Sequence, residues 1–422
     1  MEIIKYLVDE KNLSFCSLNK ALETPLHFFF RSCKEIEIIK FILEKKLNLF
    51  VENNNGSPAI LYLFFNESYE IIKYVIEKEN LDLEIQNKKK NTPIFIASFF
   101  SKLEIVKNLI ENFKVDYKFK NSVNNTLIHA CCSRNSNVDV IEYIINKTGY
   151  SINQVNNFNE TPLFLATLNN SNFGVIKYMM ENLKADPNAC DENGDSILHI
   201  ACGYNSLEIV KYLIEEVKVN PNVLNSQEDS VLHFACSFNP DPKVAIYLVD
   251  VVGLNINAQN IVKDTPFLFC CYFNNKDNDN LALIQFLIEK KADLKHYNSY
   301  GNNFLHFACQ NNENFEIIKY LTETCENNGI SLSCGNKYNY TPYVIAVISN
   351  KNLQSVKYLS QKIQINSKST TLNGENIIEE ACKISNNPET IKYLLIRTSN
   401  PIINEKTVKK KKFFFFIQFF KI

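Results

Sequence analysis

The sequence predicts an all-α solenoid, elongated and curved, built from about eleven repeats of two helices and an extended finger. Two observations predict this fold. A short block typified by Thr161-Pro162-Leu163-Phe164-Leu165-Ala166 recurs along almost the whole chain, and a second block such as Leu207–Ile214 follows each copy. A recurrence at intervals of 33 to 38 residues is typical of stacked supersecondary units and not of a single closed core.

The repeats are named below by the number of the first residue of the first block. These residues are Thr24, Ser57, Thr92, Thr126, Thr161, Ser196, Ser230, Thr265, Asn303, Thr341 and Asn376. No Pro-, Gly- or Ser-rich linker interrupts their phase. We therefore predict one repeat domain over residues 21–400, a partial repeat or cap over residues 1–20, and a Lys/Phe-rich low-complexity tail over residues 401–422.

Each repeat is predicted to begin with a short capped helix. Thr161 and Thr265 can cap this helix with a side-chain oxygen, and the Pro after each of them takes the first helical position, where no N–H is needed. The second block predicts an amphipathic helix whose apolar stripe, in the 196 repeat, consists of Ile209, Val210, Leu213 and Ile214. A brief alternating segment and a turn, such as Leu254–Ala258, form the finger. Because neither helix can bury its stripe alone, the repeats must stack.

The repeats resemble the ankyrin repeat, whose signature is Thr-Pro-Leu-His-x-Ala on a unit of ~33 residues. The best matches are Thr24–His27, Ser196–Ala201, Ser230–Ala235 and Asn303–Ala308, and the resemblance runs from about residue 1 to about residue 400. It implies a non-catalytic scaffold or adaptor that binds other proteins through finger tips and first-helix ends on its concave face. The corresponding positions here are our partner-binding candidates: Asn157, Phe158, Glu160, Glu192, Asn193, Asp195, Tyr204, Gln227, Asp229, Phe238, Tyr272 and Phe273.

Several predicted first helices end in aromatic residues, namely Phe64, Phe65, Phe99, Phe100, Tyr204, Phe238, Tyr272 and Phe273. A row of aromatic side chains on a concave face would be an interaction surface, because aromatic anchors dominate interface energetics. Two interpretations remain open. The row binds a partner, or it consists of core residues that fill the space beside small Gly and Ala.

The turn before each first helix departs from the ankyrin pattern, which prefers Gly in a left-handed conformation two residues before the cap. Gly194, Gly301 and Gly374 keep that residue, and Asn, which tolerates this conformation better than other residues with a side chain, replaces it at Asn55, Asn124, Asn159 and Asn339. Neither residue type is present at Leu22, Lys90, Glu228 and Lys263. We expect the turns at these four positions to be distorted.

Cysteine and histidine follow the repeat phase, which favours packing over metal binding. Six Cys lie directly after the signature Ala and two replace it: Cys132, Cys202, Cys236, Cys271, Cys309, Cys382, Cys131 and Cys270. Five His occupy the signature position, where the resemblance implies hydrogen bonds between neighbouring repeats: His27, His129, His199, His233 and His306. One His and one Cys per repeat are two ligands short of a tetrahedral zinc site. Without a disulfide framework, we expect a reduced, cytoplasmic protein.

Signatures of catalysis are absent from the sequence. It has no phosphate-binding loop, nucleophile elbow, zinc-protease motif or kinase signature set, so we expect no catalytic, cofactor-binding or metal-binding residue. With 45 basic and 46 acidic residues interleaved along the chain, we expect no nucleic-acid partner. The predicted partner is an unidentified protein, bound by a monomer.

Two insertions and the tail lie outside the regular pattern. Asn274–Asn280 lengthens the connection between two helices, and Cys325–Gly329 is expected to lengthen the loop after a second helix. Lys409–Lys412 precede a Phe-rich end that is too short for a membrane span of ~20 residues. Two interpretations of residues 409–422 remain open: contact with an anionic membrane, or translated non-coding sequence.

Two alternative functions remain open. The chain could be a membrane-skeleton linker attached through its tail. It could also be the recognition arm of an enzyme whose catalytic domain precedes Met1, because the first residues match the middle of a repeat.

Overall fold

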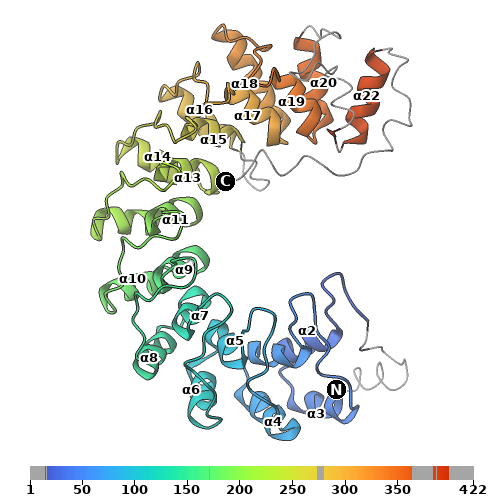
Figure 1. Cartoon of the computed structure of the whole chain (residues 1–422), viewed down its shortest axis with the longest axis vertical. Coiled ribbons are helices and arrows are strands. Elements are labelled where there is room, and N and C mark those ends of the chain that lie inside the picture. The colour runs from blue at the N-terminus through green and yellow to red at the C-terminus, as the bar shows by residue number, and fades with distance from the viewer. Residues whose placement is uncertain are drawn as a thin grey trace. The chain divides into compact units, whose positions relative to one another are not determined.

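The computed structural model describes residues 15, 17–170, 172–272, 280–363, 384–385 and 387–398. The chain forms two compact units. Unit 1 comprises Met1–Ala201 and Lys211–Val219, and unit 2 comprises Cys202–Val210 and Asn220–Ile422. In the described part of both units, paired helices alternate with extended fingers whose only β-structure is isolated bridges (Figure 1). The predicted all-α repeat solenoid is therefore confirmed.

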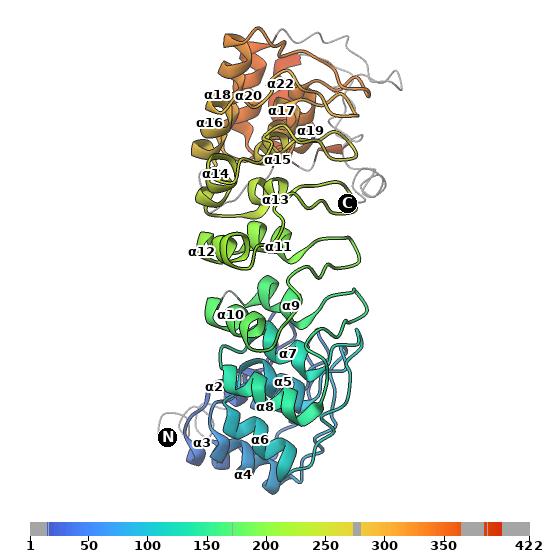
Figure 2. The same ribbon diagram turned by 90° about the vertical axis from the view of Figure 1, so that its left-hand side faces the viewer.

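Unit 1 stacks its helices in two layers. The first helices are α2 (Pro25–Ser32), η2 (Ala59–Phe65), α5 (Pro93–Phe100), α7 (Leu127–Arg134) and α9 (Pro162–Asn169). The second helices are α3 (Ile36–Glu44), α4 (Tyr69–Glu79), α6 (Leu103–Glu111), α8 (Val138–Thr148) and α10 (Phe173–Glu181). The first helices pack on one another in chain order, in the pairs α2/η2, η2/α5, α5/α7 and α7/α9 (Figure 2).

Unit 2 repeats the same arrangement. Its first helices are α13 (Val231–Phe238), α15 (Pro266–Tyr272), α17 (Phe304–Asn311) and α19 (Pro342–Ser349). Its second helices are α14 (Pro242–Asp250), α16 (Leu281–Glu289), α18 (Phe315–Asn327) and α20 (Leu353–Lys362), and α22 (Pro388–Thr398) packs on α20. The 196 repeat, with α11 (Ile197–Tyr204), α12 (Leu207–Lys211) and the π-helical turn η3 (Tyr212–Glu216), is divided between the two units.

Several first helices are capped as the sequence predicts, whereas Thr92 Oγ1 ahead of α5 is buried and makes no cap bond. Thr161 Oγ1 accepts a hydrogen bond from the backbone N–H of Phe164 at 3.2 Å, and Pro162 follows at the first helical position. Where the signature His is present, it closes a capping box: the backbone N–H of Thr24 donates to His27 Nδ1 at 3.0 Å. His27 Nε2 lies 3.2 Å from the carbonyl oxygen of Ser57 in the next repeat, which confirms the predicted link between neighbours.

The first block of the 57 repeat is out of register with the sequence alignment. Its helix is capped by Pro58, not by Ser57, and the left-handed residue is Gly56, not Asn55. The segment from Pro58 to Asn66 is one residue shorter than in other repeats, and it forms the 3₁₀ helix η2. A 3₁₀ helix rises about 2.0 Å per residue against 1.5 Å for an α-helix, so fewer residues cover the length that stacking demands.

The second helices bury the apolar stripe that the sequence predicts. Ile209, Val210 and Leu213 are fully buried in the 196 repeat, whereas Ile214, the fourth residue of the predicted stripe, is half-buried. The α-helix there ends at Lys211 and continues as the π-helical turn η3, a change of winding that the apolar pattern does not reveal. In the 303 repeat, α18 extends to Asn327 because Cys325 continues the buried stripe of Ile317 and Leu321. The insertion at Cys325–Gly329 therefore lengthens mainly a helix, which corrects the expectation of a longer loop.

A column of buried Asn residues joins successive repeats at the end of the first helix. Asn135 Nδ2 donates to the carbonyl oxygens of Ser98 at 3.1 Å and Ser101 at 3.0 Å in the preceding repeat. Its Oδ1 accepts from the backbone N–H of Asn137 at 2.9 Å, ahead of the second helix. Amide donation to the preceding repeat recurs at Asn66, Asn170, Asn239, Asn312 and Asn350.

The four turns without Gly or Asn are not distorted, contrary to expectation. Leu22, Lys90, Glu228 and Lys263 have φ values of 58°, 57°, 61° and 62°. Asn124 and Gly194 have φ values of 65° and 76° at the same place. The hydrogen bonds of the finger hold these residues in the left-handed region in spite of the steric cost of Cβ.

Several sequence predictions lie outside the described residues. They concern most of the proposed cap over residues 1–20, Phe273 and Asn274–Asp279 of the first insertion, Gly374, Asn376, Cys382 and the tail over residues 401–422.

Candidate protein-interaction surface

Each described finger turns at an Asn or Asp whose side chain fixes the turn. Asn156 Oδ1 accepts hydrogen bonds from the backbone N–H groups of Phe158 at 2.9 Å and Glu160 at 3.0 Å. The same pair of bonds recurs at Asn53, Asn87, Asn121, Asp191, Asn225, Asn260, Asn298 and Asn336. The finger tips are therefore fixed platforms that present their side chains in a defined direction.

Five of the partner-binding candidates are exposed on these tips. They are Asn157, Phe158, Glu192, Asn193 and Gln227. In unit 1 the backbone N–H of Glu192 donates to the carbonyl oxygen of Phe158 at 2.9 Å, so neighbouring tips are joined. The same link in unit 2 runs from the N–H of Ile261 to the carbonyl oxygen of Gln227 at 3.0 Å. The tips thus form a continuous array within each unit.

The three acidic candidates at the base of the fingers are less accessible. Glu160 is half-buried and accepts from Asn156 Nδ2 at 2.6 Å, and burial raises the pKa of its carboxyl. Asp229 is only 6% exposed and accepts from Asn260 Nδ2 at 2.8 Å. Asp195 is half-buried, and its backbone N–H donates to Asp191 Oδ1 at 2.8 Å. Glu160 and Asp229 therefore already bind the chain itself.

The aromatic first-helix ends divide into buried and exposed groups. Phe64 is fully buried, whereas Tyr204 is 45% exposed. In unit 2 the ring of Tyr204 stacks on that of half-buried Phe238, with centroids 5.3 Å apart and planes 18° apart. Tyr272 is half-buried, with its ring 5.9 Å from that of Phe307.

A second exposed row lies in unit 1, and we call its four residues the arginine-capped row. The Phe65 and Phe100 rings lie 5.4 Å apart, centroid to centroid. Arg31 Cζ lies 5.4 Å from the Phe65 centroid, and Arg134 Cζ lies 5.9 Å from the Phe100 centroid. The two Phe are among the aromatic first-helix ends that the sequence predicts, whereas the two Arg were not predicted. The scarcity of arginine, with three Arg among 45 basic residues, was the signal that could have found them.

A comparison with known protein families covers most of the repeats described above. A family model described as "Ankyrin repeats (3 copies)" matches overlapping windows at residues 29–121, 59–157, 94–191, 169–260, 232–333 and 267–369. The chain belongs to the ankyrin repeat family. Ankyrin repeats are generally protein–protein interaction modules. A search of curated proteins found no match to this chain.

Three signature His residues of these ankyrin repeats, His129, His233 and His306, are held neutral. Burial lowers the pKa of His129 and His306 to about 4, and it lowers the pKa of His233 as well. In each ring Nδ1 accepts a backbone N–H from the cap, at 3.2 Å for His129 and 3.1 Å for His233. A second proton on Nδ1 would face that N–H group. These side chains are therefore suited to structural hydrogen bonding and not to proton transfer.

The Cys residues of the ankyrin signature are packing residues, as predicted. Seven are buried within the described residues, namely Cys131, Cys132, Cys202, Cys236, Cys270, Cys271 and Cys309. Burial raises the thiol pKa, to about 12 for Cys270 and well above the usual range for Cys236. Because the thiolate is the reactive form, the thiols of Cys270 and Cys236 are poor nucleophiles and poor metal ligands at neutral pH.

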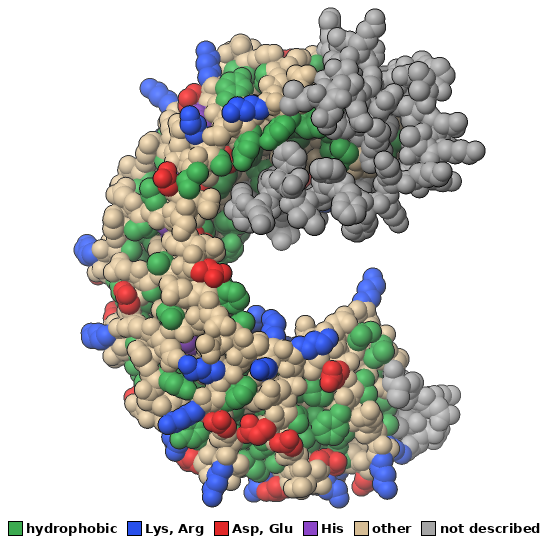
Figure 3. All heavy atoms as spheres, viewed as in Figure 1, with side chains coloured by type: hydrophobic (Ala, Val, Ile, Leu, Met, Phe, Trp, Pro, Cys, Tyr) green, Lys and Arg blue, Asp and Glu red, His purple; other side chains and the backbone are tan. Residues whose placement is uncertain are grey.

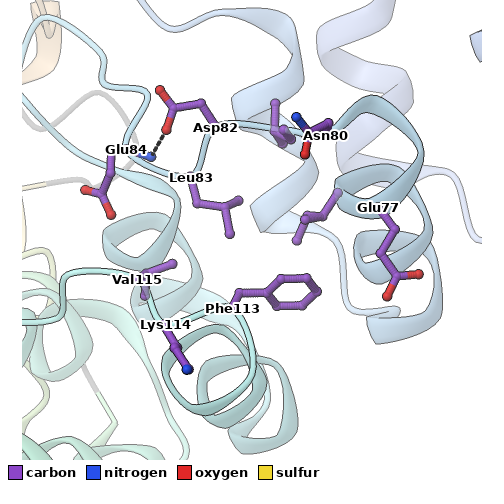
Figure 4. A pocket seen from close by; sticks show the side chains of 10 residues that line it. Glu77, Asn80, Asp82, Leu83, Glu84, Phe113, Lys114 and Val115 are labelled. Atoms are coloured by element: carbon purple, nitrogen blue, oxygen red, sulfur yellow. Dashed lines mark hydrogen bonds between the residues drawn. The ribbon is translucent and has the colours of Figure 1, made fainter.

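A hollow of about 590 Å³ lies where α4 and α6 meet their following loops (Figure 4). Asp82 Oδ1 accepts from the backbone N–H of Glu84 at 2.9 Å, and Glu84 Oε1 accepts from that of Asp116 at 3.2 Å. Two of its acidic groups thus order the local loops, and the remaining lining is Ile76, Glu77, Asn80, Leu81, Leu83, Phe113, Lys114 and Val115.

The surface has no other clustered chemistry in the parts that the structure describes. No group of three His, Cys, Asp or Glu among those residues could hold a metal ion. No described helix is long and apolar enough to cross a membrane. On the face drawn in Figure 3, basic side chains are scattered among acidic and apolar ones.

Proposed function

We propose that this ankyrin protein is a non-catalytic scaffold or adaptor that binds a partner protein through its first-helix ends and finger tips. The observation that carries the proposal is the stacked pair of exposed Tyr204 and half-buried Phe238. Large aromatic groups at the centre of an interface supply much of the binding energy. The pair occupies the positions that the ankyrin resemblance assigns to partner contact.

Packing accounts for Phe238 but not for Tyr204. The Phe238 ring contacts Phe234 edge to face at 5.6 Å and lies against Gly203. Tyr204 keeps 45% of its surface in solvent, although it is large and mostly apolar. A ring that is stacked on a neighbour and still partly exposed is preordered at little further entropic cost, which favours binding.

The chemistry of the buried groups supports a non-catalytic role. Burial lowers the pKa of His129 and His306, and it raises the thiol pKa of Cys202 and Cys271. A catalytic site needs an accessible nucleophile or a base with a pKa near the working pH. We therefore assign these groups to the stacking of repeats.

Affinity capture with matched variants tests the binding role. Full-length wild type, Tyr204→Ala/Phe238→Ala and Val251→Ala are immobilised, and the captured proteins are quantified. Val251 is the control because it is an apolar residue of unit 2 with 69% exposure, beyond the end of α14. We expect the double variant to lose partners that the Val251 variant keeps. Equal capture by a double variant with an unchanged melting temperature would overturn the role of this pair.

The free thiols bear on the compartment. All the Cys residues that the structure describes are unpaired, including half-exposed Cys33, Cys190 and Cys334. Disulfides are rare where glutathione keeps thiols reduced, so we place the protein in the cytoplasm. Fractionation of cells that express the full chain tests this, and recovery in the secreted fraction would contradict it.

We also expect a monomer, and light scattering during gel filtration measures its mass.

A further inference from the structure

We propose that the arginine-capped row of unit 1 binds an extended acidic peptide segment of a partner protein. This proposal rests on the proposed function and names the chemistry of the segment bound at one part of the surface. The row consists of Arg31, Phe65, Phe100 and Arg134, one residue from each of four successive repeats.

The four side chains form one continuous arrangement. Each step in the row is a ring contact of 5.4 to 5.9 Å, within the range of cation–π and aromatic pairing. Arg31, Phe100 and Arg134 are exposed, and Phe65 is half-buried. Phe100 keeps 43% of its surface in solvent. The row therefore offers an apolar surface between two guanidinium groups.

The two guanidinium groups keep their hydrogen-bonding capacity for a ligand. Among the described residues, the carboxylates that form ion pairs do so with Lys, and none lies within 4.0 Å of Arg31 or Arg134. Each guanidinium has five N–H donors in a planar fork that matches a carboxylate in two parallel bonds. Stacking on an aromatic ring fixes the orientation of the guanidinium plane but leaves the N–H groups at its edge available.

The use of arginine at these two places is selective. The chain has 42 Lys and three Arg, and two of the three Arg lie in this row. Each lies in the last turn of a first helix, where any cation stabilises the helix dipole. Lys would serve that purpose equally well. A planar, stacked donor that binds carboxylate in two bonds is what Arg supplies and Lys does not.

The local charge favours an acidic ligand. The loops that follow these first helices carry Lys34 and Lys102 together with Glu35 and Glu67. Lys34 and Glu67 already lie 3.6 Å apart as an exposed ion pair. These four charges cancel. Glu23 also lies near the row, because it accepts a hydrogen bond from the Tyr62 hydroxyl at 2.7 Å and the Tyr62 ring lies 5.3 Å from that of Phe65. The two Arg still leave an excess of positive charge at the row.

The length of the row fits a ligand that carries two separated negative charges. Three contacts of 5.4, 5.4 and 5.9 Å place the two Cζ atoms no more than about 17 Å apart. A span of up to that limit can accommodate two separate carboxylates. In an extended strand, residues i and i+4 lie on one face about 13 Å apart. Two acidic residues at this spacing, with an apolar residue midway against Phe100, match the row.

A direct binding measurement tests the proposal. The probe is a fluorescent peptide with the core Glu-Ser-Leu-Ser-Glu between Gly-Ser flanks, titrated with the full-length chain. We expect saturable binding that weakens as NaCl rises, because exposed charges are screened. The matched probe with both Glu replaced by Gln should bind at least about tenfold more weakly. Failure of the Glu probe to saturate, or equal binding of both probes, overturns the proposal.

A charge-preserving variant distinguishes bidentate binding by the guanidinium groups from the effect of positive charge alone. Arg31→Lys/Arg134→Lys keeps the net charge and the helix-end cations, and we expect about tenfold weaker probe binding with an unchanged melting temperature. Arg397→Lys, which alters the remaining Arg in α22, is the control and should bind as wild type does. Wild-type affinity in the double Lys variant would overturn the role of the guanidinium fork. Tighter binding of a single-stranded RNA than of the Glu probe would overturn the peptide assignment.

This test and the test of the proposed function can fail separately. If Tyr204→Ala/Phe238→Ala loses its captured partners while the Glu probe does not bind, the scaffold function stands and the acidic-peptide site falls. If the Glu probe binds through the two Arg while Tyr204→Ala/Phe238→Ala captures the same proteins as wild type, the row is a binding site and the aromatic pair is not.

Discussion

The Nε2 atom of His233 lies 3.1 Å from the carbonyl oxygen of Asp264, 31 residues later, so one imidazole joins two neighbouring repeats. Nδ1 of the same ring accepts the backbone N–H of Ser230 at 3.1 Å. The neutral ring with its proton on Nε2 satisfies both bonds, whereas a doubly protonated ring can no longer accept the backbone N–H of Ser230. His129 and His306 make the same pair of contacts.

Mild acid should weaken the stack through these His residues. The pKa of His129 and His306 is about 4 in the folded chain and 6.5 in the unfolded chain. Their stabilising effect is complete above pH 6.5 and is lost as the pH falls towards 4, because the unfolded chain then binds more protons. Each shift corresponds to about 3 kcal/mol as an upper figure. We expect the urea midpoint, followed by circular dichroism, to fall between pH 7 and pH 4.5.

His306→Phe is the matched variant, because Phe95 and Phe164 occupy the same position in two other repeats. It removes one of the shifted groups, so its urea midpoint should fall less steeply with acid than that of wild type. Its stability at pH 7 should be lower, since the bond of 3.1 Å to the Tyr340 carbonyl is lost. Identical pH profiles for the two proteins would contradict this origin of acid sensitivity.

Asp264→Asn should stabilise the protein at neutral and alkaline pH. Burial, helped by the charge of Asp229, raises the pKa of the Asp264 carboxyl from 3.8 to about 6. The folded state therefore disfavours the charged form, and the penalty grows as the pH rises from about 4 to above 6. Asn keeps the oxygen that accepts from Asn298 Nδ2 at 2.8 Å. We expect a gain of about 2 kcal/mol at pH 8.

The same variant supplies its own control through pH. At pH 4 the wild-type carboxyl is largely protonated in the folded chain, so the two proteins should melt at nearly the same temperature. Asn is compatible with this position because Asn91, Asn125 and Asn302 occupy it in other repeats and accept the same bond. A stability difference that does not change between pH 4 and pH 8 would show that charge is not the cause.

The sequence predicts the repeats, their caps and their packing residues, because these depend on local spacing that recurs in each repeat. It fails at the 57 repeat because Ser57-Pro58 resembles the usual Thr-Pro cap. The actual cap, Pro58, depends on Gly56 and on the length that η2 must span between neighbouring helices. That length is set by stacking and is not visible in one repeat.

The candidate surface is predicted less completely, for a related reason. The finger-tip candidates are exposed, but Glu160 and Asp229 accept hydrogen bonds from Asn156 and Asn260. Asn260 belongs to the repeat after Asp229, and periodicity along one repeat does not show which side chains meet across two. The arginine-capped row was not predicted for the same reason, because its four residues come from four different repeats.

Asn135→Ala should be among the most destabilising substitutions at a buried polar position. It removes two amide bonds to the Ser98 and Ser101 carbonyls and leaves those oxygens without this donor inside the stack. It also removes the cap bond to Asn137. We expect a loss of about 3 kcal/mol in the free energy of unfolding, measured by urea titration.

Asn135→Ser separates hydrogen bonding from side-chain volume. Ser101 occupies this place in the 92 repeat, where its Oγ donates to one carbonyl, that of Phe64, at 3.3 Å. The Ser variant should therefore lose less stability than the Ala variant. Equal losses would mean that the amide bonds contribute little beyond packing.

Lys263→Gly should stabilise the finger before α15. Lys263 has φ 62°, where a Cβ atom crowds the following carbonyl group, and Gly has no Cβ. The backbone bond from Lys263 N–H to the Asn260 carbonyl, 2.8 Å long, needs no side chain and should persist. Relief of the steric cost, reduced by the greater freedom of Gly in the unfolded chain, predicts a gain of about 1 kcal/mol. Lys263→Ala is the control, because it removes the same charge but keeps Cβ. Its melting temperature should stay at the wild-type value. If Lys263→Ala raised the stability as much as Lys263→Gly, the gain would come from loss of the Lys side chain and not from the backbone.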